Sequence, residues 1–181
     1  MRIFISLPIP KEVKTQLKNT QKQIQANNKT PKVKWTEPSK MHVTLKFIGD
    51  LEKDELEQLS TLIKQAAEPI VPFKFSFFKL DAFPSLDNPS VLINKLKELN
   101  GRNSFELEQN LRSYLDKNSL PYDNKKWIPH ITLGRIQKDN SEIRLPNLDI
   151  DYSFKVDEVE IKKSKLKPSG PEYKTLESIK L

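Results

Sequence analysis

A tetrapeptide that occurs twice constrains this chain more than any other feature of its sequence. Residues 42–45 read His-Val-Thr-Leu and residues 130–133 read His-Ile-Thr-Leu, and these two motifs contain the only two histidines among the 181 residues. Because side chains alternate between the faces of a β-strand, each motif places its His and Thr on one face and its two aliphatic residues on the other. The repeat therefore predicts two equivalent strands, each packing its apolar face on a core.

Two such strands, related by an approximate twofold axis, would line a groove with His42, Thr44, His130 and Thr132. An imidazole with a pKa of about 6.5 can accept or donate a proton near neutral pH. One neutral histidine can take a proton from water while one protonated histidine gives a proton to a leaving oxygen. Threonine hydroxyls can donate hydrogen bonds to phosphate oxygens as negative charge develops. The four side chains thus predict a site for cleaving a phosphate diester.

Two basic residues close to the motifs are further candidates for phosphate binding. Arg135 follows the second motif, and its guanidinium has the right geometry to clamp a phosphate. Strict alternation places Arg135 on the apolar face, so it reaches the groove only if a bulge or the strand end turns it. Lys46 shares the face of His42 and Thr44 by the same alternation, where it would meet a phosphate or lie in solvent.

Other readings of the motifs are less well supported by the sequence. A single His-x-Thr-Leu strand can be purely structural, but here the repeat uses every histidine of the chain. Two histidines without cysteine or a neighbouring ligand cluster fall short of the usual set of metal ligands, so no metal site is expected. The sequence contains neither a G-x-S-x-G nucleophile motif nor a glycine-rich phosphate loop.

The pattern of apolar residues predicts a mixture of helices and strands. Helices are expected at residues 11–26, 54–67 and 104–117, the last of them capped by Ser104. Strands are expected at residues 2–7, 33–35, 42–48, 73–78, 91–93, 128–136, 152–166 and 173–179. We expect a Pro-rich loop at residues 81–90 and either one strand or two bulge-separated strands at 152–166. This order indicates an α+β fold in one domain, residues 1–181.

Aromatic residues near the motifs give a weaker signal. Trp35, Phe47, Phe83 and Trp127 could stack on nucleobases beside a groove. Burial habits nevertheless favour the hydrophobic core for Phe47 and for the phenylalanines of residues 73–78.

Composition limits the class of protein. The net charge of +7 favours a polyanionic partner, although the abundance of lysine also fits a biased amino-acid usage. The chain has no cysteine, which excludes disulfides and thiol nucleophiles. No apolar run approaches the roughly 20 residues of a membrane span, and the N-terminus lacks a signal-peptide pattern. We therefore expect a cytoplasmic protein that does not enter membranes.

Longer segments around the motifs carry a resemblance to a known family. They are Met-His-Val-Thr-Leu-Lys-Phe-Ile-Gly at 41–49, Pro-His-Ile-Thr-Leu-Gly-Arg at 129–135, Arg-Ile-Phe at 2–4, Val-Lys-Trp at 33–35, Phe-Pro at 83–84 and Gly-Pro-Glu-Tyr at 170–173. With these segments the chain resembles the two-histidine phosphoesterase superfamily, specifically its RNA 2′,3′-cyclic phosphodiesterases, also called 2′-5′ RNA ligases. Family members often have an aromatic residue and a glycine where this chain has Val-Leu-Ile-Asn at 91–94.

The resemblance implies a fold and a reaction. The fold would be two-lobed and pseudo-twofold, with antiparallel sheets lining a central cleft and helices packed outside. The reaction would be hydrolysis of a 2′,3′-cyclic phosphate to a 2′-phosphomonoester without metal or other cofactor. His42 would donate a proton to the departing 3′ oxygen, His130 would accept one from water, and Thr44 and Thr132 would hold the phosphate. Arg135 matches a basic position that often follows the second motif.

The partner implied is RNA with a 2′,3′-cyclic phosphate end, such as a tRNA fragment, and we expect a monomer. Three alternatives stay open. The same chemistry with a ribose 5′-hydroxyl in place of water would give 2′-5′ ligation. A small cyclic nucleotide or an ADP-ribose cyclic phosphate could replace RNA. A non-catalytic RNA-binding module is also conceivable, although binding alone would not require two titratable groups.

Overall fold

The computed structural model describes residues 1–28, 33–137, 143–148, 150–168 and 170–181. Its helices are α1 (Lys11–Ala26), α2 (Lys53–Ala67) and α3 (Asn103–Lys117), and a short 3₁₀ helix, Pro38–Lys40, precedes the first motif. All three predicted helices are confirmed to within one residue. No helix in these described ranges is long and apolar enough to cross a membrane.

The strands form a sheet that nearly divides into two halves. They are β1 (Arg2–Leu7), β2 (Val33–Trp35), β3 (Val43–Asp50), β4 (Phe73–Pro84), β5 (Pro89–Leu99), β6 (His130–Ile136), β7 (Ser153–Val156), β8 (Glu158–Lys167) and β9 (Gly170–Lys180). Their order is β7-β4-β5-β6-β3-β1-β8-β9, with β2 added to β6, and all pairings in the described chain are antiparallel.

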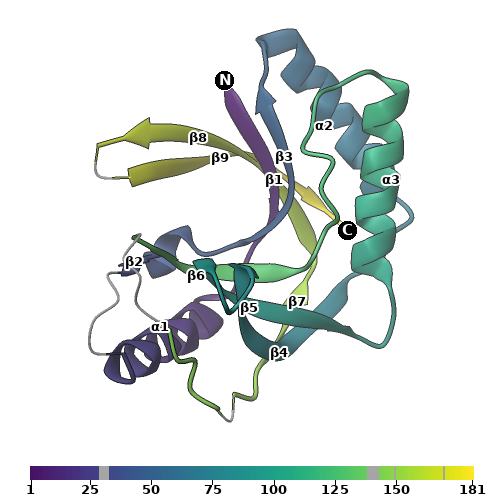
Figure 1. The fold of residues 1–181 in the computed structure, drawn as a ribbon. Coiled ribbons are helices and arrows are strands. Elements are labelled where there is room, and N and C mark those ends of the chain that lie inside the picture. The colour runs from purple at the N-terminus through teal and green to yellow at the C-terminus, as the bar shows by residue number, and fades with distance from the viewer. Residues whose placement is uncertain (29–32, 138–142, 149, 169) are drawn as a thin grey trace.

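The two half-sheets meet where the motif strands meet. Strands β3 and β6 pair only through Val43 and Ile131, the second residues of the two motifs. One half-sheet is β7-β4-β5-β6 with β2, and the other is β3-β1-β8-β9. This arrangement confirms the predicted α+β fold with antiparallel strands in two lobes. It also places both motifs at the centre of the molecule (Figure 1).

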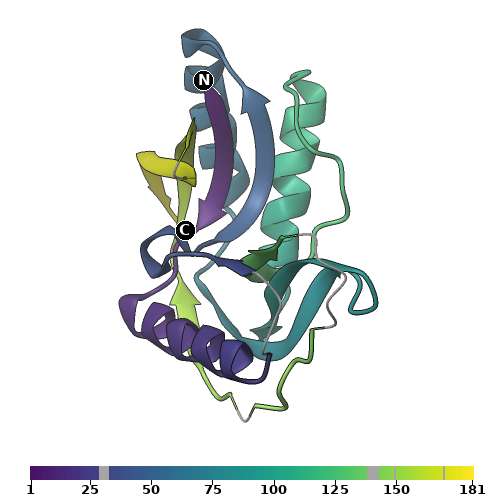
Figure 2. The ribbon, with the colours of Figure 1, turned by 60° about the vertical axis from the view of Figure 1, so that its left-hand side comes forward.

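Helices cover the two lobes at opposite ends. In both ribbon views α2 and α3 lie together along β1 and β3, whereas α1 lies at the other end of the molecule (Figures 1 and 2). Their buried residues follow helical spacing: Val13, Leu17 and Ile24 in α1, and Leu59, Leu62 and Ile63 in α2. These side chains join the inward faces of the strands in one cluster of buried apolar residues.

The Pro-rich segment at residues 81–90 is largely strand, so the predicted loop is wrong. Strand β4 continues to Pro84 and β5 begins at Pro89, so only residues 85–88 remain outside the hairpin. Both prolines lie at strand ends, where the missing N–H removes little from the ladder. The hairpin carries Phe83 alongside Val91.

Residues 152–166 also differ from the prediction. They form two strands separated at Asp157, but not by a bulge within one ladder. Strand β7 pairs with β4 and β8 pairs with β1, so the two strands belong to different half-sheets. The chain crosses from one lobe to the other at this point.

The cap of α3 is a third difference. Ser104 lies inside the helix, and Arg102 occupies the N-cap position. The carboxylate of Glu98 on β5 caps the helix instead, because it accepts hydrogen bonds from the backbone N–H groups of Asn103 and Ser104 at 2.8 and 2.9 Å. A carboxylate at a helix N-terminus satisfies free N–H groups and interacts favourably with the helix dipole.

Candidate active site

The two motifs face each other across a local twofold axis. Because β3 and β6 are antiparallel and meet at Val43 and Ile131, the two strands run away from that pair in opposite directions. Val43 and Ile131 are fully buried, as are the motif leucines, whereas His42, Thr44, His130 and Thr132 are partly exposed on the other face. The alternation inferred from the sequence is therefore present in both strands.

Each motif is followed by the same irregularity. In β3, Thr44 pairs with Ser6 and Lys46 pairs with Ile5, so Leu45 is skipped. In β6, Thr132 pairs with Ile93 and Gly134 pairs with Leu92, so Leu133 is skipped. The two motif leucines thus form equivalent β-bulges. A one-residue bulge reverses the faces of all later residues in the strand.

The bulge in β6 turns Arg135 toward the histidines. Arg135 is exposed and lines the same cleft as His130 and Thr132, while Ile136 packs on the core. Arg135 therefore reaches the groove by way of a bulge, one of the two possibilities that the sequence allows. Gly134 permits the close packing of β2 on this bulge, because a Cβ at this position would lie 2.6 Å from Cγ1 of Val33 and 3.1 Å from Cε3 of Trp35.

The bulge in β3 has the opposite effect on Lys46. Its side chain is 3% exposed, on the core side of the strand, and its Nζ lies 2.5 Å from Oε1 of the buried Glu108 on α3. The Lys46 ammonium also lies 5.2 Å from the centre of the Tyr122 ring. Neither predicted position for Lys46, a phosphate contact or solvent, is correct. The alternation that suggested them stops at Leu45.

The two imidazoles are held in the same way. Nδ1 of His42 lies 2.7 Å from the carbonyl oxygen of Lys40, and Nδ1 of His130 lies 2.6 Å from that of Ile128. A carbonyl can only accept, so each Nδ1 carries the proton and each neutral ring keeps a lone pair on Nε2. Nε2 of His42 lies 3.1 Å from the hydroxyl of Thr44. Both rings can therefore take up a proton at Nε2.

Aromatic side chains fix both rings from the side. Phe4 and Tyr173 pack on His42 with ring centres 5.0 and 5.3 Å away, and the Tyr173 ring is perpendicular to the imidazole. Phe83 packs on His130 at 5.0 Å with an interplanar angle of 84°. These rings restrict each imidazole to one orientation.

Burial keeps both histidines neutral in the free protein. Burial lowers the pKa of His42 to about 4, and the positive charge of Lys162 also lowers it, against the hydrogen bond to the backbone carbonyl, which raises it. Burial likewise lowers the pKa of His130, and the charge of Lys95 adds to this effect. Each lysine is itself paired: Lys162 lies 2.9 Å from Glu160 and Lys95 lies 2.7 Å from Asp81.

The motif side chains line one cleft of about 370 Å³ together with Arg135. The other residues that line it are Arg2, Ile3, Phe4, Lys34, Trp35, Thr36, Glu37, Lys40, Met41, Phe47, Ser164, Leu166, Gly170, Pro171 and Tyr173. They come from β1, β2, β3, β8, β9 and the segment before β3. All five sequence-predicted residues are thus brought together in one place.

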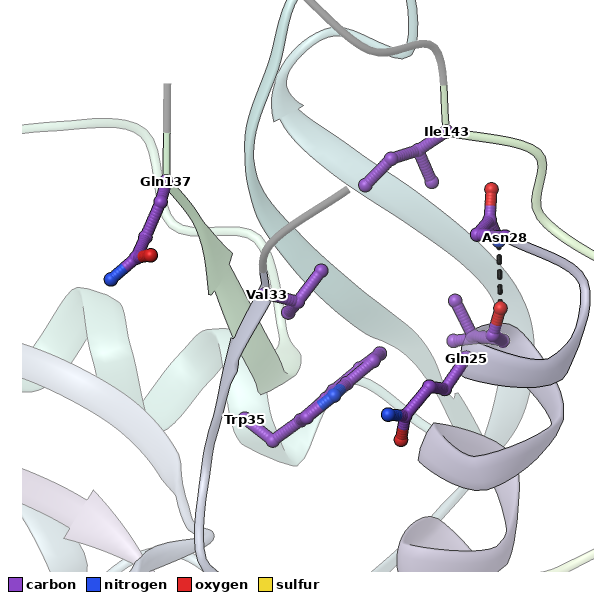
Figure 3. A pocket seen from close by; sticks show the side chains of 7 residues that line it. Gln25, Asn28, Val33, Trp35, Gln137 and Ile143 are labelled. Atoms are coloured by element: carbon purple, nitrogen blue, oxygen red, sulfur yellow. Dashed lines mark hydrogen bonds between the residues drawn. The ribbon is translucent and has the colours of Figure 1, made fainter. Parts of the chain in front are cut away.

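Figure 3 shows a second cavity, of about 360 Å³. Trp35 lines both cavities. The other walls of the second cavity are aliphatic, from Ile24, Val33 and Ile143, or carboxamide, from Gln25, Asn28 and Gln137. Its described walls include no titratable group and none of the predicted catalytic residues, so the cleft is the candidate active site.

The aromatic residues predicted near the groove have different positions. Trp35 lines the cleft and Phe83 packs on His130. Trp127 packs on Phe105 of α3 and donates its indole N–H to the carbonyl of Thr44 at 2.9 Å, so it supports the first motif from outside the cleft. Phe47 lines the cleft and is 53% exposed, so the predicted core position of Phe47 is wrong.

Phe4 and Tyr173 were not singled out by sequence reasoning as site residues. Their positions depend on the pairing of β1 with β3 and of β8 with β9, which no local pattern encodes. The only sequence signal for these two residues is that both lie in segments that carry the family resemblance. Across the described ranges, no three His, Cys, Asp or Glu side chains gather into a group that could hold a metal ion.

Comparison with known sequences identifies relatives of this chain along its full length. The model of the family described as LigT like phosphoesterase matches residues 7–93. The RNA 2′,3′-cyclic phosphodiesterase of Methanothermobacter thermautotrophicus is 25% identical over 188 residues, which cover 100% of this chain and 99% of that protein. The protein of the same name from Archaeoglobus fulgidus is 28% identical, with 97% and 98% covered.

Solved structures share the fold. A crystal structure from Thermus thermophilus aligns with a TM-score of 0.86 at 27% identity and covers 100% of this chain and 98% of that one. The crystal structure of E. coli LigT complexed with 3′-AMP aligns with a TM-score of 0.81 at 20% identity, covering 99% and 97%. Both alignments span both half-sheets and all three described helices.

Proposed function

Because the chain belongs to the family of LigT-like phosphoesterases, we propose that it is an RNA 2′,3′-cyclic phosphodiesterase that forms a 2′-phosphomonoester. The observation that carries the proposal is the pair of imidazoles in one cleft, each with its Nδ1 proton held by a carbonyl and its Nε2 available. The full-length relatives named as RNA 2′,3′-cyclic phosphodiesterases support the same conclusion.

The proposed reaction is one in-line displacement at phosphorus. Nε2 of His130 accepts a proton from water, and the water oxygen forms a bond to phosphorus. The bond from phosphorus to the 3′ oxygen breaks, and Nε2 of His42 gives that oxygen a proton. The phosphate stays on the 2′ oxygen. One proton is taken up and one is released, so the two histidines exchange protonation states during the reaction.

Charge in the transition state is balanced by donors from the same cleft. The hydroxyls of Thr44 and Thr132 donate to the non-bridging phosphate oxygens, and Arg135 adds a positive charge. This set supplies proton transfer and anion stabilisation, so the proposed reaction uses neither a metal nor another cofactor. All of these groups come from one chain, so the proposed site needs no residue from a second copy, and a monomer stays a prediction from the sequence. A cytoplasmic location stays a prediction from the sequence.

The roles of the two histidines follow from the family resemblance, because the Nδ1 hydrogen bonds of the two rings are equivalent. The pKa of about 4 keeps His42 neutral in the free protein at pH 7. As the proton donor, His42 must therefore be charged in the complex. The negative phosphate beside Nε2 favours the charged imidazole and raises its pKa.

The test is hydrolysis of an oligonucleotide with a 2′,3′-cyclic phosphate end in the presence of EDTA. We expect a 2′-phosphate product, and His42→Ala and His130→Ala should each reduce kcat by at least about 10²-fold. A fully active single variant would overturn the paired mechanism. RNA binding without turnover would instead indicate a binding module. Adding an acceptor with a free 5′-hydroxyl shows whether 2′-5′ linked products also form.

A further inference from the structure

A row of polar side chains extends from Thr44 across its half-sheet. Thr44 on β3 pairs with Ser6 on β1, and Ser6 pairs with Glu160 on β8. The side chains of directly paired residues lie on the same face of a sheet, with Cβ atoms about 4.5–5.5 Å apart. Ser6 therefore lies on the cleft face of its strand, directly beside Thr44.

The twofold-related row has no hydroxyl at the same place. Thr132 on β6 pairs with Ile93 on β5, and Ile93 pairs with Asp81 on β4. Ser6 and Ile93 thus occupy equivalent positions in their half-sheets, and both are fully buried. Of the two motif threonines, Thr44 alone has a hydroxyl at this position beside it.

The hydroxyl of Ser6 is buried and has no hydrogen-bond partner among the described residues. A buried hydroxyl without a partner costs free energy, and most buried polar groups in folded proteins are paired. Two acceptors lie on either side of Ser6 in its row, the hydroxyl oxygen of Thr44 and the carboxylate of Glu160.

Substrate binding affects these two acceptors differently. The Glu160 carboxylate accepts from the Thr175 hydroxyl at 3.2 Å, and its other oxygen, although not hydrogen-bonded, lies 2.9 Å from the Lys162 ammonium. The Thr44 hydroxyl lies 3.1 Å from Nε2 of His42 and can donate its one proton there. A phosphate in the cleft would compete with Nε2 for this proton. Thr44 is therefore the acceptor whose hydrogen bonds change when substrate enters.

We propose that Ser6 is a positioning residue for Thr44 and holds the Thr44 hydroxyl toward the phosphate as negative charge develops, an inference that rests on the proposed cyclic phosphodiesterase function. The bound phosphate takes the proton that Thr44 gives to Nε2 in the free protein. The Thr44 oxygen then accepts a hydrogen bond from Ser6, whose hydroxyl turns toward it by rotation about the Cα–Cβ bond.

The consequence is that the two motif threonines contribute unequally. Hydrogen bonds in series polarise one another, so the Ser6 hydroxyl strengthens the bond from Thr44 to the phosphate. Thr132 donates without this support, because the side chain of Ile93 has no polar group.

The first test separates this role from a structural one. Ser6→Ala removes a hydroxyl without a partner, so the free energy of unfolding should not decrease. We expect kcat for a nucleoside 2′,3′-cyclic phosphate to fall about 3- to 10-fold, with KM little changed because Ser6 does not contact the substrate. An unchanged kcat, or a clear loss of stability, would overturn the inference.

Ser76→Ala is the matched control for Ser6→Ala. The hydroxyl of Ser76 is also buried without a partner among the described residues, but Ser76 lies on β4 and does not line the cleft. We expect kcat of Ser76→Ala to equal that of the wild-type protein. An equal loss of kcat in both variants would assign the effect to packing and overturn the role of Ser6.

A double-variant cycle tests whether Ser6 acts through Thr44. In a Thr44→Val background, Ser6→Ala should have no further effect on kcat, because the hydroxyl that Ser6 orients is gone. In a Thr132→Val background the full effect of Ser6→Ala should remain. An undiminished effect in the Thr44→Val background would show that Ser6 does not act through Thr44.

Failure of the proposed function would give a different result. If the wild-type protein hydrolyses no cyclic phosphate, calorimetric titration with inorganic phosphate takes the place of turnover. Ser6→Ala should then raise the Kd of phosphate when Thr44 is present but not in the Thr44→Val background. Equal Kd values for the wild-type protein and Ser6→Ala, or no binding of phosphate, would overturn the role of Ser6.

Discussion

Each proposed proton transfer depends on one nitrogen atom, Nε2 of His42 or of His130. Both atoms are available because a backbone carbonyl two residues earlier fixes the tautomer of each ring. The residue types and their spacing could be predicted from the sequence, since the repeat uses both histidines of the chain. The rings that orient them could not, because Phe4 and Tyr173 belong to other strands and meet His42 only through sheet pairing.

The lowered histidine pKa values predict how stability depends on pH. The pKa of His42 is about 4 in the folded protein, against 6.5 in the unfolded chain. Between pH 6.5 and pH 4 the unfolded chain therefore binds a proton at His42 while the folded protein does not. The free energy of unfolding is highest above pH 6.5 and decreases by up to about 3 kcal/mol as the pH falls toward 4. His130, whose pKa is also lowered, acts in the same direction.

Denaturant unfolding at several pH values, together with NMR titration of the two histidine resonances, measures this effect. The two histidine resonances can be assigned with His42→Gln, because this variant retains only His130. Inorganic phosphate should raise the pKa of His42 and so stabilise the protein more at pH 5 than at pH 8. A His42 pKa near 6.5 without phosphate would contradict the proposed desolvation.

Strands β3 and β6 show what periodicity in a sequence can and cannot reveal. Alternation correctly oriented the motif residues as far as Leu45 and Leu133. It failed for Lys46 and Phe47 because a bulge adds one residue without changing the composition of the strand. Prolines explain the wrong loop at residues 81–90: they favour a loop in the sequence, but β4 ends with Pro84 and β5 begins with Pro89.

The ion pair between Lys46 and Glu108 joins the first motif strand to α3. Because both groups are buried, Lys46→Met should leave an uncompensated carboxylate and lower the free energy of unfolding by about 3–5 kcal/mol. The double variant Lys46→Met/Glu108→Leu should recover most of this loss, because it removes both charges. Denaturant unfolding of the three proteins measures the effect.

A surface ion pair provides the control for this prediction. Lys180 and Glu158 lie 2.9 Å apart, and the Lys180 side chain is 71% exposed. Lys180→Met should leave the free energy of unfolding nearly unchanged. An equally small effect of Lys46→Met would show that the buried pair does not contribute to stability.

The whole molecule is two half-sheets joined at one residue pair, a topology that the sequence indicated only through its repeat and its family resemblance. The crossing of the chain between lobes at Asp157 could not be predicted, because it depends on which strands β7 and β8 pair with. The organisation as one domain stays a prediction, supported by the cluster of buried apolar residues that both lobes share.

The charge of the molecule predicts a difference between long and short substrates. The net charge is +7, and Arg2, Lys34, Lys40 and Arg135 line the cleft, where Glu37 is the single acidic residue among those described. An RNA strand places further phosphates near these cations. Raising the salt concentration from about 50 to about 200 mM should therefore increase KM more for an oligonucleotide than for a mononucleoside 2′,3′-cyclic phosphate.

Steady-state kinetics with both substrates at each salt concentration checks this prediction. Equal increases in KM would mean that the protein contacts only the terminal phosphate, which would favour small cyclic nucleotides as substrates.

The equivalent bulges in β3 and β6 have a consequence for the direction of the reaction. A centre with twofold symmetry has no preferred acid and no preferred base, because a substrate turned end for end would meet the same imidazoles and hydroxyls in exchanged order. Phe47 and Arg135 break that equivalence. Which histidine acts as the acid in the proposed reaction would then depend on which end of the substrate lies near Phe47 and which lies near Arg135.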